Sequence, residues 1–198
     1  MKRHTSVRSI CRCVAALGLA AALGAITPQA LSAGSACTIS GTSGDDHLRG
    51  TPRRDKICGF GGDDVIRGLD GLDVLEGGTG DDTIYGNLTH DFLYGGRGSD
   101  SLIPGQGGDI IDGGLGNDFS SVTSDGNDTW QGGRGRDHLT DLSGTDVIRG
   151  GADDDPCLAT LDEHDGDWIS GGHGHDAWDA DANDSVVGAE EQIHCLAE

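Results

Sequence analysis

The chain of 198 residues has little of the material from which an ordinary globular core is built. Aromatic residues make up 4% of it and hydrophobic residues 34%, whereas 36 residues are glycine. An interior glycine costs a helix about 1 kcal/mol relative to alanine, so this glycine density excludes helix over most of the chain. The composition alone is compatible with disorder. Only a regular placement of the few apolar residues would supply a core.

The sequence also lacks the short motifs of the common enzyme classes. It has no HExxH zinc-protease motif, no GxSxG nucleophile motif and no phosphate-binding loop, and Lys56 is the one lysine after residue 36. His164, His173 and His175 form the one histidine cluster, and we interpret them as solvated loop residues. The sequence therefore predicts a protein that is not an enzyme.

The first 36 residues differ from the rest. Four basic residues precede an apolar run over residues 14–26, and small residues follow up to Ala33 and Ala36. This pattern is typical of a secretory signal peptide with cleavage near Ala33 or Ala36. The run is shorter than the roughly 20 residues of a membrane span. We expect a secreted, extracellular protein with no transmembrane segment, the alternative being a lipoprotein lipidated at Cys37.

Negative charge dominates the remainder. Residues 37–198 hold all 34 acidic residues but only 9 of the 13 basic ones. This excess makes nucleic acid an unsuitable partner. Carboxylates in a compact body repel one another, so either the fold is weakened or cations neutralise them.

A nine-residue repeat organises the chain. Residues 59–85 read GFGGDDVIR, GLDGLDVLE and GGTGDDTIY. Nine such repeats run over residues 41–121, four over 123–158 after the single residue Val122, and two over 162–179 after a three-residue insertion. A short sustained period predicts a solenoid whose coils stack on one another.

Three positions of the repeat carry the pattern. Position eight is Leu, Ile or Trp in thirteen repeats, with Ser120 and Cys157 as the exceptions, and is the predicted core position. Trp130 and Trp178 fall there, whereas Trp168 at position seven is expected on the outer face. Position four is glycine in eleven repeats, and the other four are predicted to have weaker or altered turns: Arg53, Thr89, Asp153 and Asp165. Position six is aspartate in all fifteen: Asp46, Asp55, Asp64, Asp73, Asp82, Asp91, Asp100, Asp109, Asp118, Asp128, Asp137, Asp146, Asp155, Asp167 and Asp176.

Each repeat is expected to form a six-residue glycine-rich turn and a three-residue strand, with two repeats per coil. Odd and even repeats then build two facing parallel sheets, and stacking places the aspartates of alternate repeats in two columns. Rows of like charges are destabilising. Calcium, which takes six to eight oxygen ligands at roughly 2.3 to 2.6 Å, suits a site of aspartates and turn carbonyls between successive coils, whereas magnesium demands a stricter octahedron.

GGTGDDTIY and GGRGSDSLI resemble the GGxGxDxUx motif of the RTX (repeats-in-toxin) family of hemolysin-type calcium-binding repeats. The resemblance implies a single right-handed parallel β-roll over residues 37–198 that binds multiple calcium ions, is unfolded at low cytosolic calcium and folds after export. It also implies that the fifteen aspartates are the calcium ligands. The chain departs from the family in its N-terminal export segment and in having no catalytic or toxin domain.

Four cysteines remain after residue 36. Export permits disulfides, and Cys58 and Cys157 are roughly five coils apart, or about 25 Å, too far for one bond. The pairs Cys37–Cys58 and Cys157–Cys195 are therefore expected to clamp the two ends of the solenoid. Zinc binding is not expected, because no CxxC pair is present.

The predicted function is a secreted calcium-binding protein with a structural, display or adhesion role toward a cell-surface or matrix partner. The alternative is a calcium-dependent enzyme acting on acidic polysaccharide or phospholipid, lyase-like or epimerase-like, or an accessory module of one. Such an enzyme would need Arg, Lys or Tyr gathered beside the calcium column. Adhesion through bridging calcium is a third possibility.

Overall fold

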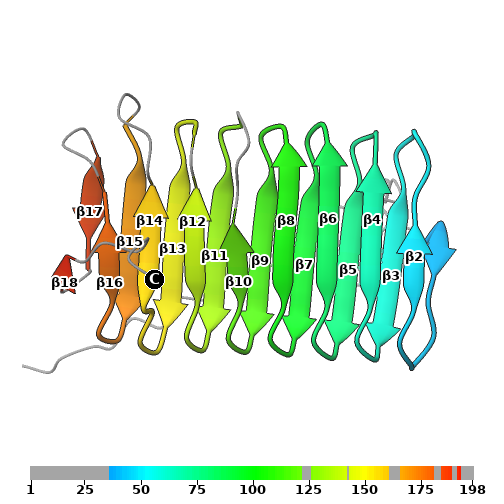
Figure 1. Ribbon diagram of the computed structural model, residues 1–198, viewed down its shortest axis with the longest axis horizontal. Coiled ribbons are helices and arrows are strands. Elements are labelled where there is room, and N and C mark those ends of the chain that lie inside the picture. Colours follow the sequence, from blue (N-terminus) through cyan, green and yellow to red (C-terminus); the bar gives the residue numbers. More distant parts are fainter. Residues whose placement is uncertain are drawn as a thin grey trace, which may run out of the picture. The chain divides into compact units, whose positions relative to one another are not determined.

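The computed structural model describes residues 36–121, 126–141, 143–160, 166–180, 184–188 and 191–192. These residues belong to one compact unit, Ser35–Glu198, and their regular structure consists of strands (Figure 1). Among them no helix is long and apolar enough to cross a membrane. The predicted signal peptide lies outside the described residues apart from Ala36.

The strands form two nine-stranded parallel sheets. The odd-numbered strands form one sheet: β1 (Ile39–Ser40), β3 (Lys56–Gly61), β5 (Val74–Thr79), β7 (Phe92–Arg97), β9 (Ile110–Leu115), β11 (Thr129–Arg134), β13 (Val147–Ala152), β15 (Trp168–His173) and β17 (Ser185–Val187). The even-numbered strands form the other: β2 (His47–Arg49), β4 (Val65–Leu69), β6 (Thr83–Leu88), β8 (Ser101–Gln106), β10 (Phe119–Ser121), β12 (His138–Asp141), β14 (Cys157–Thr160), β16 (Ala177–Asp179) and β18 (Glu191–Gln192).

Each strand pairs with the strand two further along the chain, so one coil contains two repeats. Ile57 pairs with Leu75, and Leu75 with Leu93, in parallel register. The prediction of an all-β parallel solenoid with two repeats per coil is confirmed. The turns after the odd-numbered strands lie along one edge of the solenoid, which we call edge A, and those after the even-numbered strands along the other, edge B (Figure 1).

The prediction of three-residue strands was wrong. Nine of the eighteen strands have six residues and continue through positions one to three of the next repeat, which leaves a shorter turn at positions four to six. The reason is that neighbouring coils also pair through the glycine-rich positions, for example Gly78 with Gly96 and Thr79 with Arg97. Glycine at these positions permits close stacking as well as turning.

The two breaks in the period are absorbed without loss of register. Trp130 pairs with Ile111 across Val122, and Ile169 pairs with Ile148 across the three-residue insertion. One assignment changes: Leu158, rather than Cys157, pairs with Leu139 and fills the core position. Pro156 follows Asp155 and has no N–H to donate to the ladder, so the strand begins one residue later.

The core is one side chain thick. It consists of position-eight residues, joined by Leu158: Ile57, Ile66, Leu75, Ile84, Leu93, Leu102, Ile111, Trp130, Leu139, Ile148, Leu158 and Ile169. Trp178 packs against this row, and Ser120 is buried within it. Trp168 is half-buried on the outer face, where the Arg149 guanidinium lies 4.9 Å from its ring centre. The expectations for the three tryptophans are therefore confirmed.

Substituting Leu93 with alanine tests the single-row core. Leu93 is 0% exposed, and deleting a buried leucine side chain costs about 2–5 kcal/mol of unfolding free energy. Leu88, 43% exposed, is the matched control, and Leu88→Ala should change that free energy by about 0.5 kcal/mol or less. Denaturant unfolding in calcium measures both. Equal losses in the two variants would show that the row is not the core.

Candidate metal-binding aspartate columns

The aspartates at position six line the interior of the solenoid in two columns. Column A, at edge A, contains Asp46, Asp64, Asp82, Asp100, Asp118, Asp137, Asp155 and Asp176. Column B, at edge B, contains Asp55, Asp73, Asp91, Asp109, Asp128, Asp146 and Asp167. The structure thus brings all fifteen predicted residues into two continuous series.

One hydrogen bond repeats along both columns. The backbone N–H of each aspartate donates to Oδ1 of the aspartate one coil further on, at 2.8 Å from Asp82 to Asp100 and 2.8 Å from Asp73 to Asp91. The bonded residues are 18 apart in sequence within the regular repeats, 19 apart across Val122 and 21 apart across the second break. Both columns therefore continue across the two insertions with the same hydrogen bond.

The second carboxylate oxygen is left buried. From Asp64 onward the position-six aspartates are at most 2% exposed, although charged residues are rarely buried without a partner. Oδ2 has no hydrogen-bond partner within the described structure at ten of them: Asp64, Asp73, Asp82, Asp91, Asp100, Asp109, Asp118, Asp137, Asp155 and Asp176. A buried carboxylate oxygen without a partner is unfavourable unless a cation or a hydrogen-bond donor compensates it.

Position-one glycines explain where these oxygens lie. A Cβ atom on Gly59 would stand 2.1 Å from Asp64 Oδ2 and 2.6 Å from the carbonyl oxygen of Gly77 on the next coil. The same arrangement recurs at Gly77, at 2.3 Å from Asp82 Oδ2 and 2.7 Å from a carbonyl oxygen. A carboxylate oxygen and a backbone carbonyl thus flank one small space that only glycine leaves open.

Burial sets the protonation of the columns. The pKa values of Asp82, Asp91, Asp118 and Asp155 are raised to about 7, chiefly by burial and also by neighbouring carboxylates, against the lowering effect of a backbone hydrogen bond. The pKa values of Asp100 and Asp137 rise to about 6, again chiefly through burial. Without a cation, the columns cannot be fully ionised at neutral pH.

The donor set fits calcium. Within the described residues no group of three or more His, Cys, Asp or Glu side chains is placed to hold an ion by itself. Each coil offers one carboxylate per edge, and the remaining ligands must be backbone carbonyls. A shell of carboxylate and carbonyl oxygens in flexible turns suits calcium better than magnesium, and zinc sites are built mainly from histidine and cysteine.

Column B extends one residue further than the repeats predicted. Asp167 N–H donates to Asp184 Oδ1 at 3.1 Å, and Val186 pairs with Ile169. Repeat counting missed Asp184 because the glycines that open a repeat do not precede it. The available signal was the sequence Asp184-Ser-Val-Val, which keeps the spacing between position six and position eight.

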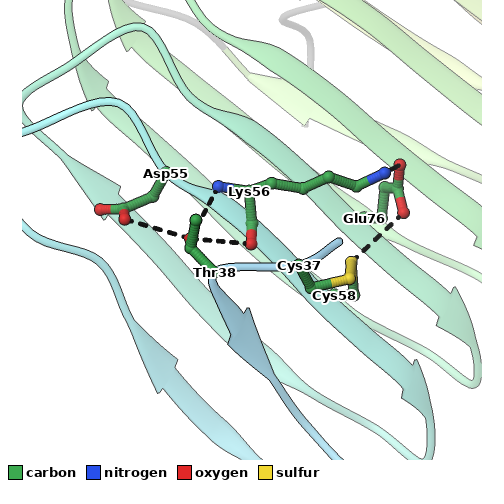
Figure 2. Close-up of a disulfide and its surroundings, with 6 residues drawn as sticks. All are labelled: Cys37, Thr38, Asp55, Lys56, Cys58 and Glu76. Carbon is green, nitrogen blue, oxygen red and sulfur yellow. Dashed lines mark hydrogen bonds and ion pairs between the residues drawn. A yellow bond between two sulfur atoms is a disulfide. The ribbon is translucent and has the colours of Figure 1, made fainter. Parts of the chain in front are cut away.

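The N-terminal end of column B is closed by a threonine and a disulfide. Thr38 Oγ1 donates to Asp55 Oδ1 at 3.1 Å, where no preceding aspartate exists, and accepts from Lys56 N at 2.9 Å (Figure 2). Burial acts to raise the pKa of Asp55, but hydrogen bonds from Thr51 and Thr38 bring it below its usual value. Column B therefore begins with an ionised carboxylate.

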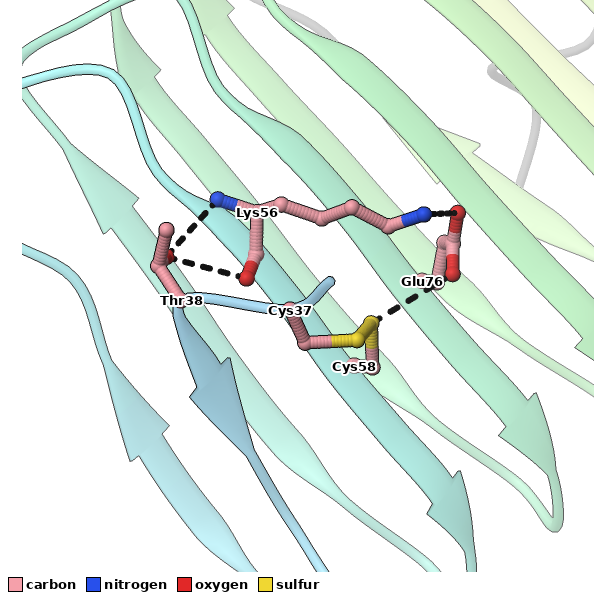
Figure 3. Close-up of polar contacts among 5 residues, drawn as sticks. All are labelled: Cys37, Thr38, Lys56, Cys58 and Glu76. Atoms are coloured by element: carbon pink, nitrogen blue, oxygen red, sulfur yellow. Dashed lines mark hydrogen bonds and ion pairs between the residues drawn. A yellow bond between two sulfur atoms is a disulfide. The ribbon is translucent and has the colours of Figure 1, made fainter. Parts of the chain in front are cut away.

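The expected Cys37–Cys58 disulfide is present, with its Cα atoms 6.0 Å apart. Lys56 Nζ pairs with Glu76 Oε1 at 2.9 Å beside it, and Glu76 Oε2 lies 3.4 Å from Cys58 Sγ (Figure 3). Because the bond uses the Cys37 sulfur, it argues against lipidation at that residue. Cys157 is disulfide-bonded as well, and its expected partner, Cys195, lies outside the described residues.

The unusual turns behave differently from one another. Thr89 and Asp153 keep the left-handed backbone of the glycines they replace, with φ of 76° and 84°, so these turns are strained but not altered. Arg53 instead forms an antiparallel bridge with Thr51. Asp165 and His164 lie outside the described residues. His173 and His175 are both exposed, but only His175 lies in a turn, because His173 ends strand β15 and pairs with Ala152.

Fold and site together define a parallel β-solenoid of nonapeptide repeats with an aspartate in every interior turn. Four copies of the RTX calcium-binding nonapeptide repeat match residues 40–75, 67–102, 87–119 and 122–155. The chain belongs to this family, whose repeats bind calcium. A search among curated proteins finds no match.

The raised pKa values predict an unusual pH dependence for the metal-free protein. A carboxyl whose pKa is about 7 when folded and near 3.8 when unfolded contributes stability below about pH 4, and that contribution is lost as the pH rises through 7. Metal-stripped protein should therefore show more strand signal by circular dichroism at pH 5 than at pH 8.

In saturating calcium the sign should reverse, because protons compete with the metal for the same oxygens. A metal-stripped protein that gains order as the pH rises from 5 to 8 would contradict the burial of the aspartates.

Proposed function

We propose that the protein is a secreted calcium-binding β-roll whose fold depends on calcium and whose role is structural. The observation that carries this proposal is the set of ten buried Oδ2 atoms that have no partner among the described residues. Nine of these aspartates lie beside the position-one glycine of their own repeat, as Asp64 does beside Gly59, whereas Asp109 follows Pro104 at that position. The fifteen position-six aspartates, together with Asp184, are the proposed calcium-binding residues.

Charge energetics support the coupling of folding to calcium. Burying a polar group without compensation costs roughly 2–7 kcal/mol, and an ionised carboxylate costs more. The cost of burying ten such groups exceeds the free energy of unfolding of a typical domain, which is about 5–15 kcal/mol. The single-row core cannot offset this cost, so the ionised columns require cations before the coils can stack. Low calcium then favours the unfolded chain.

The proposed role is one without catalysis. A hollow of about 570 Å³ on edge B is lined by residues that include Leu69, Asp70, Asn87 and Leu88. It has one carboxylate and neither a histidine nor a basic residue in its lining, so it offers no acid–base pair. We therefore propose that the folded roll serves display or attachment outside the cell, the location that the N-terminal 36 residues favour.

Calcium titration of the metal-stripped protein tests the proposal. We expect a cooperative gain of strand signal in circular dichroism, together with a change in fluorescence as Trp130 becomes buried to 1% exposure. Native mass spectrometry should find several calcium ions per chain, and magnesium at the same concentration should produce neither change. Superimposable spectra in chelator and in millimolar calcium would overturn calcium-coupled folding.

The substitution Asp82→Asn separates a ligand from a structural residue. Asparagine keeps the oxygen that accepts from Asp64 N–H at 2.9 Å but removes the buried charge. The variant should therefore be more ordered than the wild type in metal-free buffer at pH 8, and it should need a higher calcium concentration to fold.

Asp70→Asn, at an exposed aspartate in the turn that also carries Asp73, is the matched control and should change neither property. A loss of order in Asp82→Asn both with and without calcium would indicate a role in packing alone.

A further inference from the structure

Exposed acidic and basic side chains occupy different parts of edge A. In the turns after β1, β3 and β5, position five carries the acidic segment Asp45, Asp63 and Asp81. In the turns after β7, β9 and β11, the same position carries Ser99, Asn117 and Arg136, and the strand ends carry Arg97, Leu115 and Arg134. We call Arg97, Arg134 and Arg136 the arginine segment. All six charged side chains are exposed.

The acidic segment is held in place by the backbone. Asp45 Oδ1 accepts from Asp63 N–H at 2.9 Å, Asp63 Oδ1 from Asp81 N–H at 2.9 Å, and Asp81 Oδ1 from Ser99 N–H at 2.7 Å. The three carboxylates therefore form a fixed row at the spacing of the coils. Edge B has no equivalent, since Arg54, Leu72 and His90 occupy position five there.

The arginine segment forms no ion pair with a carboxylate among the described residues, although Arg136 Nε donates to the backbone oxygen of Asp154, in the next turn of edge A, at 3.4 Å. Lys56 is paired with Glu76, and Arg67 lies over the Tyr85 ring at 4.8 Å. Arg97 and Arg134, by contrast, have no side-chain partner among the described residues, although the chain carries a net charge of −21. Both pair in register with Leu115, so they stand two coils, or about 10 Å, apart.

These two segments are complementary when one copy is turned against another. We propose that two copies of this chain associate through edge A in antiparallel orientation, about a two-fold axis between the turns that follow β5 and β7. Asp81 of each copy then faces Arg97 of the other, and Asp45 faces Arg134 and Arg136. The same patch serves both copies, which is the requirement for a closed symmetric dimer. Charge complementarity sets the orientation.

The contact is a narrow edge, so the association is weak and sensitive to salt. Screening shortens the range of exposed charges from about 10 Å at 0.1 M salt to 3 Å at 1 M. An acidic polysaccharide or another polyanion is the competing occupant of the arginine segment. The neighbouring acidic segment repels a polyanion and attracts a second copy, which favours the dimer.

Charge exchange tests the dimer. In calcium and low salt, sedimentation velocity should show a monomer–dimer equilibrium for the wild type that shifts to monomer in 1 M salt. Arg97→Asp/Arg134→Asp and Asp45→Arg/Asp81→Arg should each weaken dimerisation by about tenfold or more. An equimolar mixture of the two variants should restore it. Arg53→Asp/Arg54→Asp, on edge B, is the control and should dimerise as the wild type does.

Circular dichroism in calcium separates failure to fold from failure to associate, so the proposal can be rejected independently of calcium-coupled folding. If an exchanged variant does not fold, Arg97→Gln/Arg134→Gln removes the charges with a smaller change. A wild type that stays monomeric at low salt, or a mixture that does not restore the dimer, overturns the proposal. A monomer whose arginine variant loses retention on polyuronate also overturns it, in favour of a polyanion partner.

Discussion

The hydrogen bond from an aspartate N–H to Oδ1 of the next aspartate in its column is the interaction on which the rest of the structure depends. It fixes the separation of neighbouring coils, and it aims the second oxygen toward the position-one glycine of the same repeat, as Asp82 does toward Gly77 in β5. One residue thus determines both the pitch of the solenoid and the charge of its interior. Asparagine could supply the pitch but not the charge, which explains aspartate in all fifteen repeats.

A core of one side chain per strand makes this dependence strict. Fully burying a leucine or isoleucine contributes about 1.5–3 kcal/mol, and each core residue also contacts the coils on either side. A coil at the end of the stack loses half of those contacts. The N-terminal coil compensates with the Cys37–Cys58 disulfide and with Thr38, which replaces the missing aspartate as a donor to Asp55.

The sequence was sufficient to predict the coil, the two columns and the core row, because their residues recur at fixed positions. It was insufficient where a residue acts through its backbone. Gly78 resembles a turn residue by composition, yet it lies in a strand because its neighbour one coil away is also glycine. Pro156 moves the core position to Leu158 through a missing N–H. Asp184 continues column B without the glycines that would have marked a repeat.

The solvent-facing positions of the repeat are not constrained by the core or by the aspartate columns. The two edges of the solenoid differ at these positions. Positions six and eight are fixed by the interior, whereas positions three and five are mostly exposed and vary from coil to coil. Asp81 and Arg97 therefore stand on neighbouring coils of a roll whose interior is uniform. The field at edge A also includes column A directly beneath it. With the columns ionised and bare, their negative charge would attract the arginine segment toward its own chain and oppose the approach of a second acidic chain. Calcium bound in the columns, as proposed, would cancel that field and leave the exposed charges to decide what binds. On this view, the interior metal not only stabilises the roll but also sets the electrostatic conditions under which its edge can recognise a second copy.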